Sequence, residues 1–425
     1  MAACKRGWRV RSTYFFLLWI LFFVGYLGRA NYVMVLPLIQ ADLGLSHTAA
    51  GLGMSAMFFG YLLFQFGGTH LGLKLGPRKA MVAGLLFCTL FTACTGAVTT
   101  LAALVIVRAF IGAGETLHPV SSWVCLFNWF PRAEWGRANA VILTSGALAG
   151  VVTPLMVTGV FLAAGWQATF FLTAALYVVL AWLVWSRLRD RPEDHPGVSP
   201  EELDEIRQGR TGMGPAACAP SPHMFRLLAN PGIVLLVLVY FLQSFAVWGF
   251  ATWVPSYLVR ARELGMVGMG LKLPLVFGTA LLGMVLVGPL LEKLFRRRLR
   301  LFLAAIWIVG ALAFYHAQAT ADVTRCIVYL SIGAAFGIFM FSNVFWNLPR
   351  ILLPHGVFLR TTNLLITAGQ LAGCIAPVAL GWIIDNSLNG YDSAFIAIEA
   401  ALLLAAALVL LVPGKKLRAE ESGSA

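Results

Sequence analysis

Residues 14–38 read YFFLLWILFFVGYLGRANYVMVLPL, a run in which Arg29 is the only charged side chain. A helix of about 20 apolar residues is long enough to cross the hydrocarbon core of a bilayer. The run is longer than the apolar region of a cleaved signal peptide, which covers about 7 to 15 residues. It therefore predicts a transmembrane helix close to the start of the chain.

Runs of similar composition recur along the 425 residues, of which 60% are hydrophobic and only 12% charged. We predict an all-α membrane protein with about twelve transmembrane helices, each of about 20 residues. The predicted spans are 14–38, 50–73, 80–98, 101–126, 138–163, 168–187, 232–258, 273–294, 301–318, 326–350, 361–385 and 393–412.

One long polar stretch separates the sixth span from the seventh and divides the chain. The divisions are a first six-helix half (1–187), a cytoplasmic central loop (188–230), a second six-helix half (231–412) and a cytoplasmic tail (413–425). A basic cluster follows the second helix of each half, around Lys74 and Lys293. Two parallel six-helix repeats with a substrate site between them are a standard transporter architecture, the major facilitator fold.

The formal net charge of +13 comes from basic residues in the short gaps between apolar runs, most of them on one side of the predicted membrane. This asymmetry places both termini in the cytoplasm of a multi-pass inner-membrane protein. The expected partners are thus a lipid bilayer and a small substrate rather than a nucleic acid. The seven cysteines lack metal-ligand spacing, and we find no catalytic triad or phosphate loop. No metal, cofactor or catalytic residue is predicted, so the protein is not expected to be an enzyme.

Charges deep in a span are costly and need a partner or a water-filled cavity. Arg108, Gly112 and Glu115 share one helical face, and Arg108 and Glu115 lie about 10 Å apart along the axis. Arg29 of the first span could reach either level. The three charges would form a cavity with two arginines and one carboxylate, suited to an anionic substrate. The alternative is a pair that only locks helices together.

Other polar and aromatic residues within the spans could recognise hydroxyl and carboxylate groups, or could instead hydrogen-bond neighbouring helices. The candidates are Tyr26, Asn31, Tyr61, Gln65, Gln243, Asn343, Trp346, Asn363 and Gln370. Tyr26 shares a helical face with Arg29 and is the best of them. His118 could relay protons or could be a hydrogen-bonded structural residue, and Glu399 is expected at the outer membrane interface.

Together these motifs resemble the anion:cation symporter family of the major facilitator superfamily, which includes galactonate, hexuronate and glucarate permeases. The matching residues are Gly28-Arg29-Ala30-Asn31; Arg108, Gly112, Gly114, Glu115 and Pro119; Trp129-Phe130-Pro131 and Gly136-Arg137-Ala138; Asp190, Pro192, His195-Pro196, Val198-Ser199 and Glu202-Leu203; Trp253, Pro255, Tyr257 and Leu258; and Gly373, Pro377 and Gly381.

The resemblance implies an organic-anion site lined by Tyr26, Arg29, Tyr61, Arg108, Gln243 and Asn363, with Glu115 as the proton carrier. Two positions depart from the family pattern. Gly28 stands where sugar-acid permeases usually have an aspartate that shares proton coupling. At the cytoplasmic gating motif, Leu73 replaces an aspartate and Thr69 the leading glycine.

From these residues we expect a monomeric secondary active transporter of a small organic anion, with a sugar acid as the favoured substrate. Alternating access and proton symport through Glu115 are expected, with one proton per monoanion because Gly28 cannot carry a second. A proton-independent organic-anion facilitator is the closest alternative. A transporter-like anion sensor is a more distant one.

Overall fold

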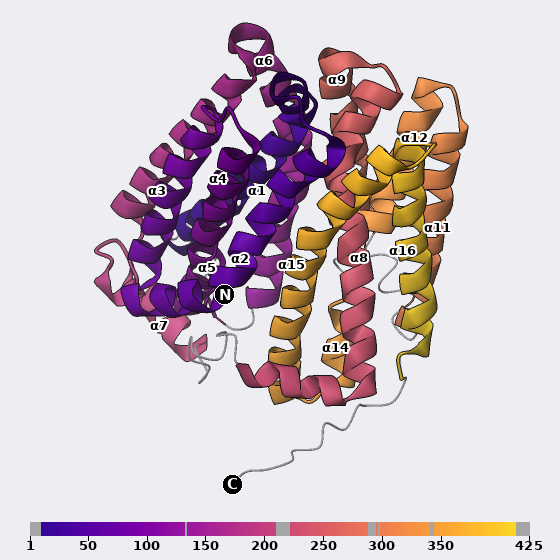
Figure 1. The fold of residues 1–425 in the computed structure, drawn as a ribbon. Helices are drawn as coiled ribbons and strands as arrows, with labels where there is room; N and C mark the ends of the chain where they lie inside the picture. The colour runs from indigo at the N-terminus through magenta and orange to yellow at the C-terminus, as the bar shows by residue number, and fades with distance from the viewer. Residues whose placement is uncertain are drawn as a thin grey trace.

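The computed structural model describes residues 10–131, 134–209, 222–287, 295, 298–340 and 344–413. Every regular element in these ranges is a helix, and the helices form two bundles that stand side by side (Figure 1). The first bundle consists of α1 (Val10–Leu43), α2 (His47–Leu75), α3 (Pro77–Thr95), α4 (Leu101–Glu115), α5 (Leu117–Trp129) and α6 (Trp135–Arg187). The second consists of α8 (Pro231–Ser256), η5 (Tyr257–Ala261), α9 (Gly265–Leu282), η6 (Gly283–Val287), α11 (Leu299–Ala319), α12 (Val323–Gly333), η7 (Ala334–Phe339), α14 (Asn347–Leu352), α15 (His355–Asn386) and α16 (Tyr391–Leu411). Between them lie η2 (Pro192–Asp194), α7 (Pro200–Gly209) and η4 (Pro222–Ala229).

The predicted membrane crossings are all represented among the described helices. Ten of these helices are long and apolar enough to cross a membrane, and Val323–Phe339 forms a shorter apolar helix. One of the ten, Thr144–Arg187, is part of α6, and α6 contains two predicted spans because Gly165 takes a left-handed conformation (φ 80°) in its middle. Glycine adopts this conformation without strain, so the chain turns there and crosses again.

Some boundaries differ from those predicted. The predicted span 101–126 is divided at Thr116 into α4 and α5, and the predicted span 326–350 ends as a helix at Phe339, before the short α14. Helix α9 begins at Gly265, earlier than the predicted residue 273. A glycine-rich first turn weakens the sequence signal, but in a bilayer the backbone remains helical because its polar groups need partners.

Large apolar side chains cover the outer faces of both bundles. Leu63, Leu90, Leu162 and Trp182 are each about 60% exposed. Contiguous exposed apolar surface of this extent marks contact with a partner or a membrane. Here it surrounds helices of membrane-spanning length, so it is the lipid-facing surface.

The two bundles meet mainly where α2 crosses α15 and where α6 packs on α9. Small residues allow the first crossing: a Cβ on Gly51 would lie 2.4 Å from the Pro377 carbonyl oxygen, and one on Gly381 would lie 2.5 Å from the His47 carbonyl oxygen. Both contacts lie near the upper end of the molecule in Figure 1, where α2 begins and α15 ends. The helices therefore approach each other most closely at that end.

The segment that follows α6 packs on the lower end of the first bundle and is more ordered than the loop we predicted for 188–230. Glu202 of α7 accepts hydrogen bonds from the backbone amides of Val10 (3.4 Å) and Arg11 (3.1 Å), so it caps α1 from a distant part of the chain. The His195 ring lies edge-on against Tyr14 and Trp129. Its burial there, with the nearby charge of Arg189, lowers the pKa of His195.

Candidate functional site

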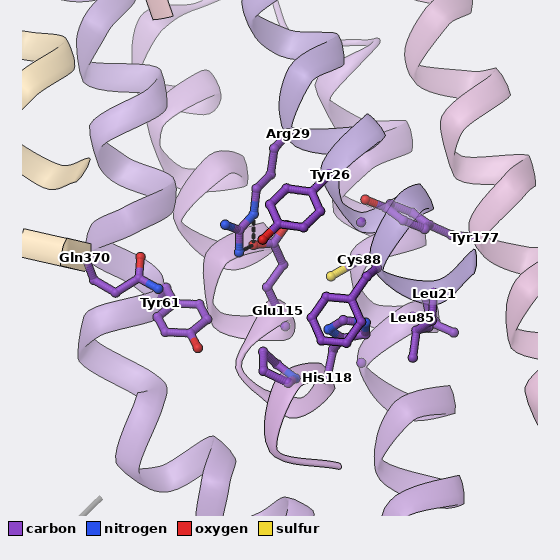
Figure 2. Close-up of a pocket in the computed structure, with 15 residues that line it drawn as sticks. Leu21, Tyr26, Arg29, Tyr61, Leu85, Cys88, Glu115, His118, Tyr177 and Gln370 are labelled. Carbon is purple, nitrogen blue, oxygen red and sulfur yellow. Dashed lines mark hydrogen bonds and ion pairs between the residues drawn. The ribbon is translucent and has the colours of Figure 1, made fainter. Parts of the chain in front are cut away.

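A cavity of about 200 Å³ lies inside the first bundle, at the level of Arg29 (Figure 2). Its lining comes from six helices of that bundle and from Gln370 of α15 in the second. The lining residues are Leu21, Phe22, Gly25, Tyr26, Arg29, Tyr61, Gly84, Leu85, Cys88, Gly114, Glu115, His118, Pro119, Tyr177 and Gln370. The cavity therefore combines aromatic and hydroxyl groups with one ion pair.

The ion pair joins α1 to the end of α4. Arg29 Nη2 lies 2.5 Å from Glu115 Oε2, and Arg29 Nε donates to the same oxygen at 2.8 Å. The two side chains are 18% and 11% exposed. Removing one partner of a buried pair leaves the other charge uncompensated, at a cost of about 3 to 5 kcal/mol. The guanidinium and the carboxylate therefore hold each other in the cavity.

Arg29 reaches the cavity because α1 turns one face toward it. Phe22, Tyr26 and Arg29 are three to four residues apart, a spacing that places their side chains on one side of a helix. The Arg29 guanidinium carbon lies 5.9 Å from the centre of the Tyr26 ring. The aromatic face adds a cation–π contact to the ion pair.

Glu115 is the last residue of α4, and the helical axis is interrupted just beyond it. The Thr116 hydroxyl donates to the Ala113 carbonyl at 2.7 Å. Pro119 has no amide hydrogen to donate to the carbonyl of Glu115 four residues earlier. The interruption places Glu115 and His118 on consecutive turns that both face the cavity.

A close crossing of α2 and α4 positions Tyr61. A Cβ on Gly112 would lie 1.8 Å from the Met57 carbonyl oxygen, so only glycine permits this approach. Tyr61, one turn beyond Met57 on α2, then reaches the cavity, which it lines together with Gln370 of α15 (Figure 2). Of the predicted site residues, the structure thus gathers Tyr26, Arg29, Tyr61, Glu115 and Gln370.

Arg108 lies elsewhere, contrary to the expectation that two arginines share one cavity. It is 1% exposed, and its Nε donates to the Gly53 carbonyl at 3.3 Å. Its guanidinium carbon lies 4.2 Å from the centre of the Tyr32 ring. Arg108 is two helical turns from Glu115, at a level where α2 packs against α4 and leaves no room for the cavity. Among the described lining residues, Arg29 is the only arginine.

Two predicted amides are fully buried between helices and are absent from the cavity lining. Asn31 donates to the Thr169 carbonyl and to the Thr173 hydroxyl, each at 3.1 Å. Gln243 donates to the Gly337 carbonyl at 2.8 Å. Both positions fit the alternative reading of the sequence, in which such amides hydrogen-bond neighbouring helices.

Gln65 of α2 is also outside the cavity lining and donates to the Thr367 hydroxyl of α15 at 3.3 Å. The other predicted residues belong to the second bundle. The Trp346 ring lies 5.4 Å from that of Tyr240, away from the cavity lining. Asn363 of α15 accepts the Thr367 hydroxyl at its backbone carbonyl and is also outside the lining. Asn343 lies outside the described residues. Glu399, expected at an interface, is 8% exposed and accepts a hydrogen bond from Gln318, far from the ion pair in sequence and in another bundle.

Sequence reasoning missed Tyr177 of α6, which lines the cavity and packs against Gly28. A Cβ on Gly28 would lie 2.0 Å from the Tyr177 hydroxyl oxygen. In this arrangement any side chain at position 28 would meet the Tyr177 phenol, so a residue larger than glycine requires the phenol to move. The only available signal was a tyrosine within an apolar span, which does not reveal which helix it faces.

Comparison with known proteins identifies relatives along most of the chain. Residues 18–377 match the sequence profile of the Major Facilitator Superfamily. The chain is 30% identical over 403 residues to a probable sulfoacetate transporter of Cupriavidus necator, covering 92% of this chain and 91% of that protein. It is 26% identical over 439 residues to a probable galactarate/D-glucarate transporter of Escherichia coli K12, covering 98% and 97%. It is 25% identical over 425 residues to a D-galactonate transporter of Escherichia coli O6:H1, covering 97% of each.

A solved structure shares the fold. It is a bacterial homologue of the human lysosomal transporter Spinster in an inward-facing, occupied conformation. The two structures superpose with a TM-score of 0.76 over 96% of this chain and 97% of that one, at 16% identity.

Proposed function

The chain belongs to the Major Facilitator Superfamily and is a multi-pass membrane transport protein rather than an enzyme, and we propose that it carries a small organic anion, with a sugar acid as the favoured substrate. The proposal places the protein in the inner membrane with both termini in the cytoplasm and has it work by alternating access. The names of its relatives, which include a sulfoacetate, a galactarate/D-glucarate and a D-galactonate transporter, support an acidic substrate.

The single observation that carries the proposal is the ion pair of Arg29 and Glu115 inside the cavity. A guanidinium presents a fork of donors that matches a carboxylate or sulfonate. In this structure Glu115 occupies that fork. A substrate anion can take its place only if Glu115 gives up its charge, since two carboxylates would otherwise compete for one cation.

Protonation of Glu115 therefore couples the proton to the anion. A protonated Glu115 no longer neutralises Arg29, which then binds the substrate. Release of the proton restores the ion pair and expels the anion. Proton and anion bind together and leave together, which is the definition of symport.

The stoichiometry follows from Gly28 and Tyr177. With no carboxylate at position 28, the cavity carries one proton for each anion. A monoanion then crosses without net charge, and the membrane potential, worth about 2.3 kcal/mol per charge per 100 mV, neither drives nor opposes it. Clear electrogenic uptake of a monoanion would contradict this stoichiometry.

Uptake by proteoliposomes tests the proposal, with labelled galactonate, glucuronate, glucarate, tartrate and sulfoacetate and with or without an inward proton gradient. The wild type should take up at least one acid faster with the gradient. Glu115→Gln should lose that stimulation and retain exchange. Glu399→Gln is the matched control, because Glu399 is also a buried carboxyl group but lies outside the cavity, and it should behave as the wild type. Equal wild-type uptake without a gradient would identify a facilitator instead.

A further inference from the structure

His118 occupies the first turn of α5, three residues after Glu115, and lines the same cavity (Figure 2). Three helical residues advance the chain by about 4.5 Å. The imidazole therefore lies one level below the ion pair, and the transport mechanism described above does not use it.

The ring is held in place but its nitrogen is not satisfied. Phe22 of α1 meets the imidazole edge-on, with ring centres 4.7 Å apart. His118 Nε2 is buried, and no residue in the described part of the chain hydrogen-bonds it. A buried polar atom without a partner has given up its bonds to water and gained nothing in exchange. The position of this nitrogen at the wall of a substrate cavity indicates that the substrate supplies its missing hydrogen-bond partner.

We propose that His118 Nε2 is the second contact of the transported anion. Arg29 binds the acidic group, and His118 binds a hydroxyl or second acidic group a few bonds away. A neutral imidazole nitrogen that carries the proton can donate to an ionised acidic group or to a hydroxyl, and one that lacks the proton can accept from a hydroxyl. The inference rests on the proposed function and deepens it, since it narrows the substrate class to acids with a second polar group. Hydroxy acids, dicarboxylic acids and sulfo acids belong to this class, and simple alkyl monocarboxylic acids do not.

Exchange in proteoliposomes without a proton gradient tests the contact separately from proton coupling. Liposomes are loaded with the labelled acid that the wild type takes up best, and efflux is driven by external tartrate, galactonate, sulfoacetate or butyrate. Butyrate is the probe that lacks a second polar group. The variants are His118→Phe, which retains a ring but removes both nitrogens, and His118→Gln, whose amide retains a donor and an acceptor.

His118→Phe should raise the half-saturation concentration of acids with a second polar group about tenfold. This is the ratio expected from the loss of one hydrogen bond. Its maximal rate should change little, and the preference for these acids over butyrate should disappear. His118→Gln should recover most of the affinity. His316→Phe is the matched control, because His316 is exposed on α11 outside the cavity.

The possible failures can be told apart. If the wild type exchanges none of the acids, the proposed function fails and the contact fails with it. If the wild type exchanges them and His118→Phe binds them equally well, only the His118 contact is wrong. An equal loss of affinity for butyrate and for the acids with a second polar group would make His118 a packing residue. This result would also overturn the proposal. If His118→Phe does not fold, His118→Leu replaces it and is judged by the same ratio of butyrate binding to tartrate binding. A ratio equal to that of the wild type would contradict the proposal.

Discussion

At the scale of single residues, the cavity depends on which side chains are absent as much as on those present. Gly28 leaves the space that the Tyr177 hydroxyl fills, and a Cβ there would lie 2.0 Å from that oxygen and 3.0 Å from the ring carbon that carries it. A glycine in the middle of a helix costs about 1 kcal/mol relative to alanine. Here the cost is offset because tyrosine and glycine fit together as a pair.

Gly28→Ala should lower the melting temperature of the detergent-solubilised protein and reduce anion exchange, because overpacking costs about 1 to 3 kcal/mol. Tyr177→Phe in the same chain should recover part of the loss, since it removes the oxygen nearest the new methyl group. The double variant Gly28→Ala/Tyr177→Phe, measured by melting and exchange, gives the coupling between the two positions. Additive effects of the two substitutions would show that the side chains do not compete for this space.

The sequence identifies the charged members of the site better than the uncharged ones. Arg29 and Glu115 are detectable because a charge inside an apolar run is costly and therefore has a function or a partner. Tyr177 and Phe22 are not, because an aromatic residue in a membrane helix is unremarkable until its neighbours across the bundle are known. Spacing along α4 predicts one shared face for Arg108 and Glu115, but spacing does not show how far a cavity extends along that face.

At the scale of elements, the packing of α2 against α4 separates Arg108 from Arg29. Arg108 holds this interface: it bonds the Gly53 carbonyl, contacts the sulfur atoms of Met54 and Met57 at 3.4 and 3.3 Å, and stacks on Tyr32. Arg29 instead faces the cavity. The same residue type therefore packs between helices at one position and lines the cavity at another.

Arg108→Gln should consequently affect the stability of the protein, whereas Arg29→Gln should affect anion binding. Arg108→Gln should lower the melting temperature, because it leaves buried groups of α2 unpaired at about 1 to 3 kcal/mol, and should change the half-saturation concentration of the anion little. Arg29→Gln should weaken anion binding severely. Thermal melting and exchange kinetics on both variants decide the assignment. A large rise in the half-saturation concentration of the anion for a stably folded Arg108→Gln would show that Arg108 belongs to the binding site.

Element existence could be predicted from the sequence far better than element ends. Apolar runs located each crossing because the bilayer requires a minimum apolar length. The break between α4 and α5 and the order of the segment 188–209 depend on contacts with other helices. Local composition does not record those contacts, so the sequence located the single crossing 101–126 but not the local break within it, and it indicated no helix in 188–209.

At the scale of the whole molecule, the polar contacts between the bundles gather at the upper end. Asp385 of α15 accepts hydrogen bonds from the backbone amides of His47 (3.0 Å) and Thr48 (2.7 Å) and from the Thr48 hydroxyl (2.6 Å). The His47 ring lies 2.7 Å from the same carboxylate. A carboxylate at a helix N-terminus is favourable, so one bundle caps a helix of the other. Alternating access requires these bonds to break whenever the upper end opens.

Asp385→Asn should loosen the upper end, because the amide lacks the charge and one of the two acceptor oxygens. The measurement uses a chain in which Cys88, which lines the cavity, is the only cysteine, and a membrane-impermeant maleimide added on the Asp385 side. The variant should be labelled several-fold faster than its parent. Asp392→Asn is the control, since Asp392 lies at the same end on α16 and is exposed. Equal labelling of parent and Asp385→Asn would mean that this carboxylate does not hold the upper end closed.

The capping of α1 by Glu202 also sets an order of events on the ribosome. The amides of Val10 and Arg11 emerge at the start of translation, and the carboxylate that satisfies them is made only after all of α6. Growing chains generally fold from the N-terminus, unit by unit. Glu202 precedes α8 in the chain, so this cap can form before α8 has left the ribosome. The order of the chain thus allows the lower end of the first bundle to form before the second bundle is inserted.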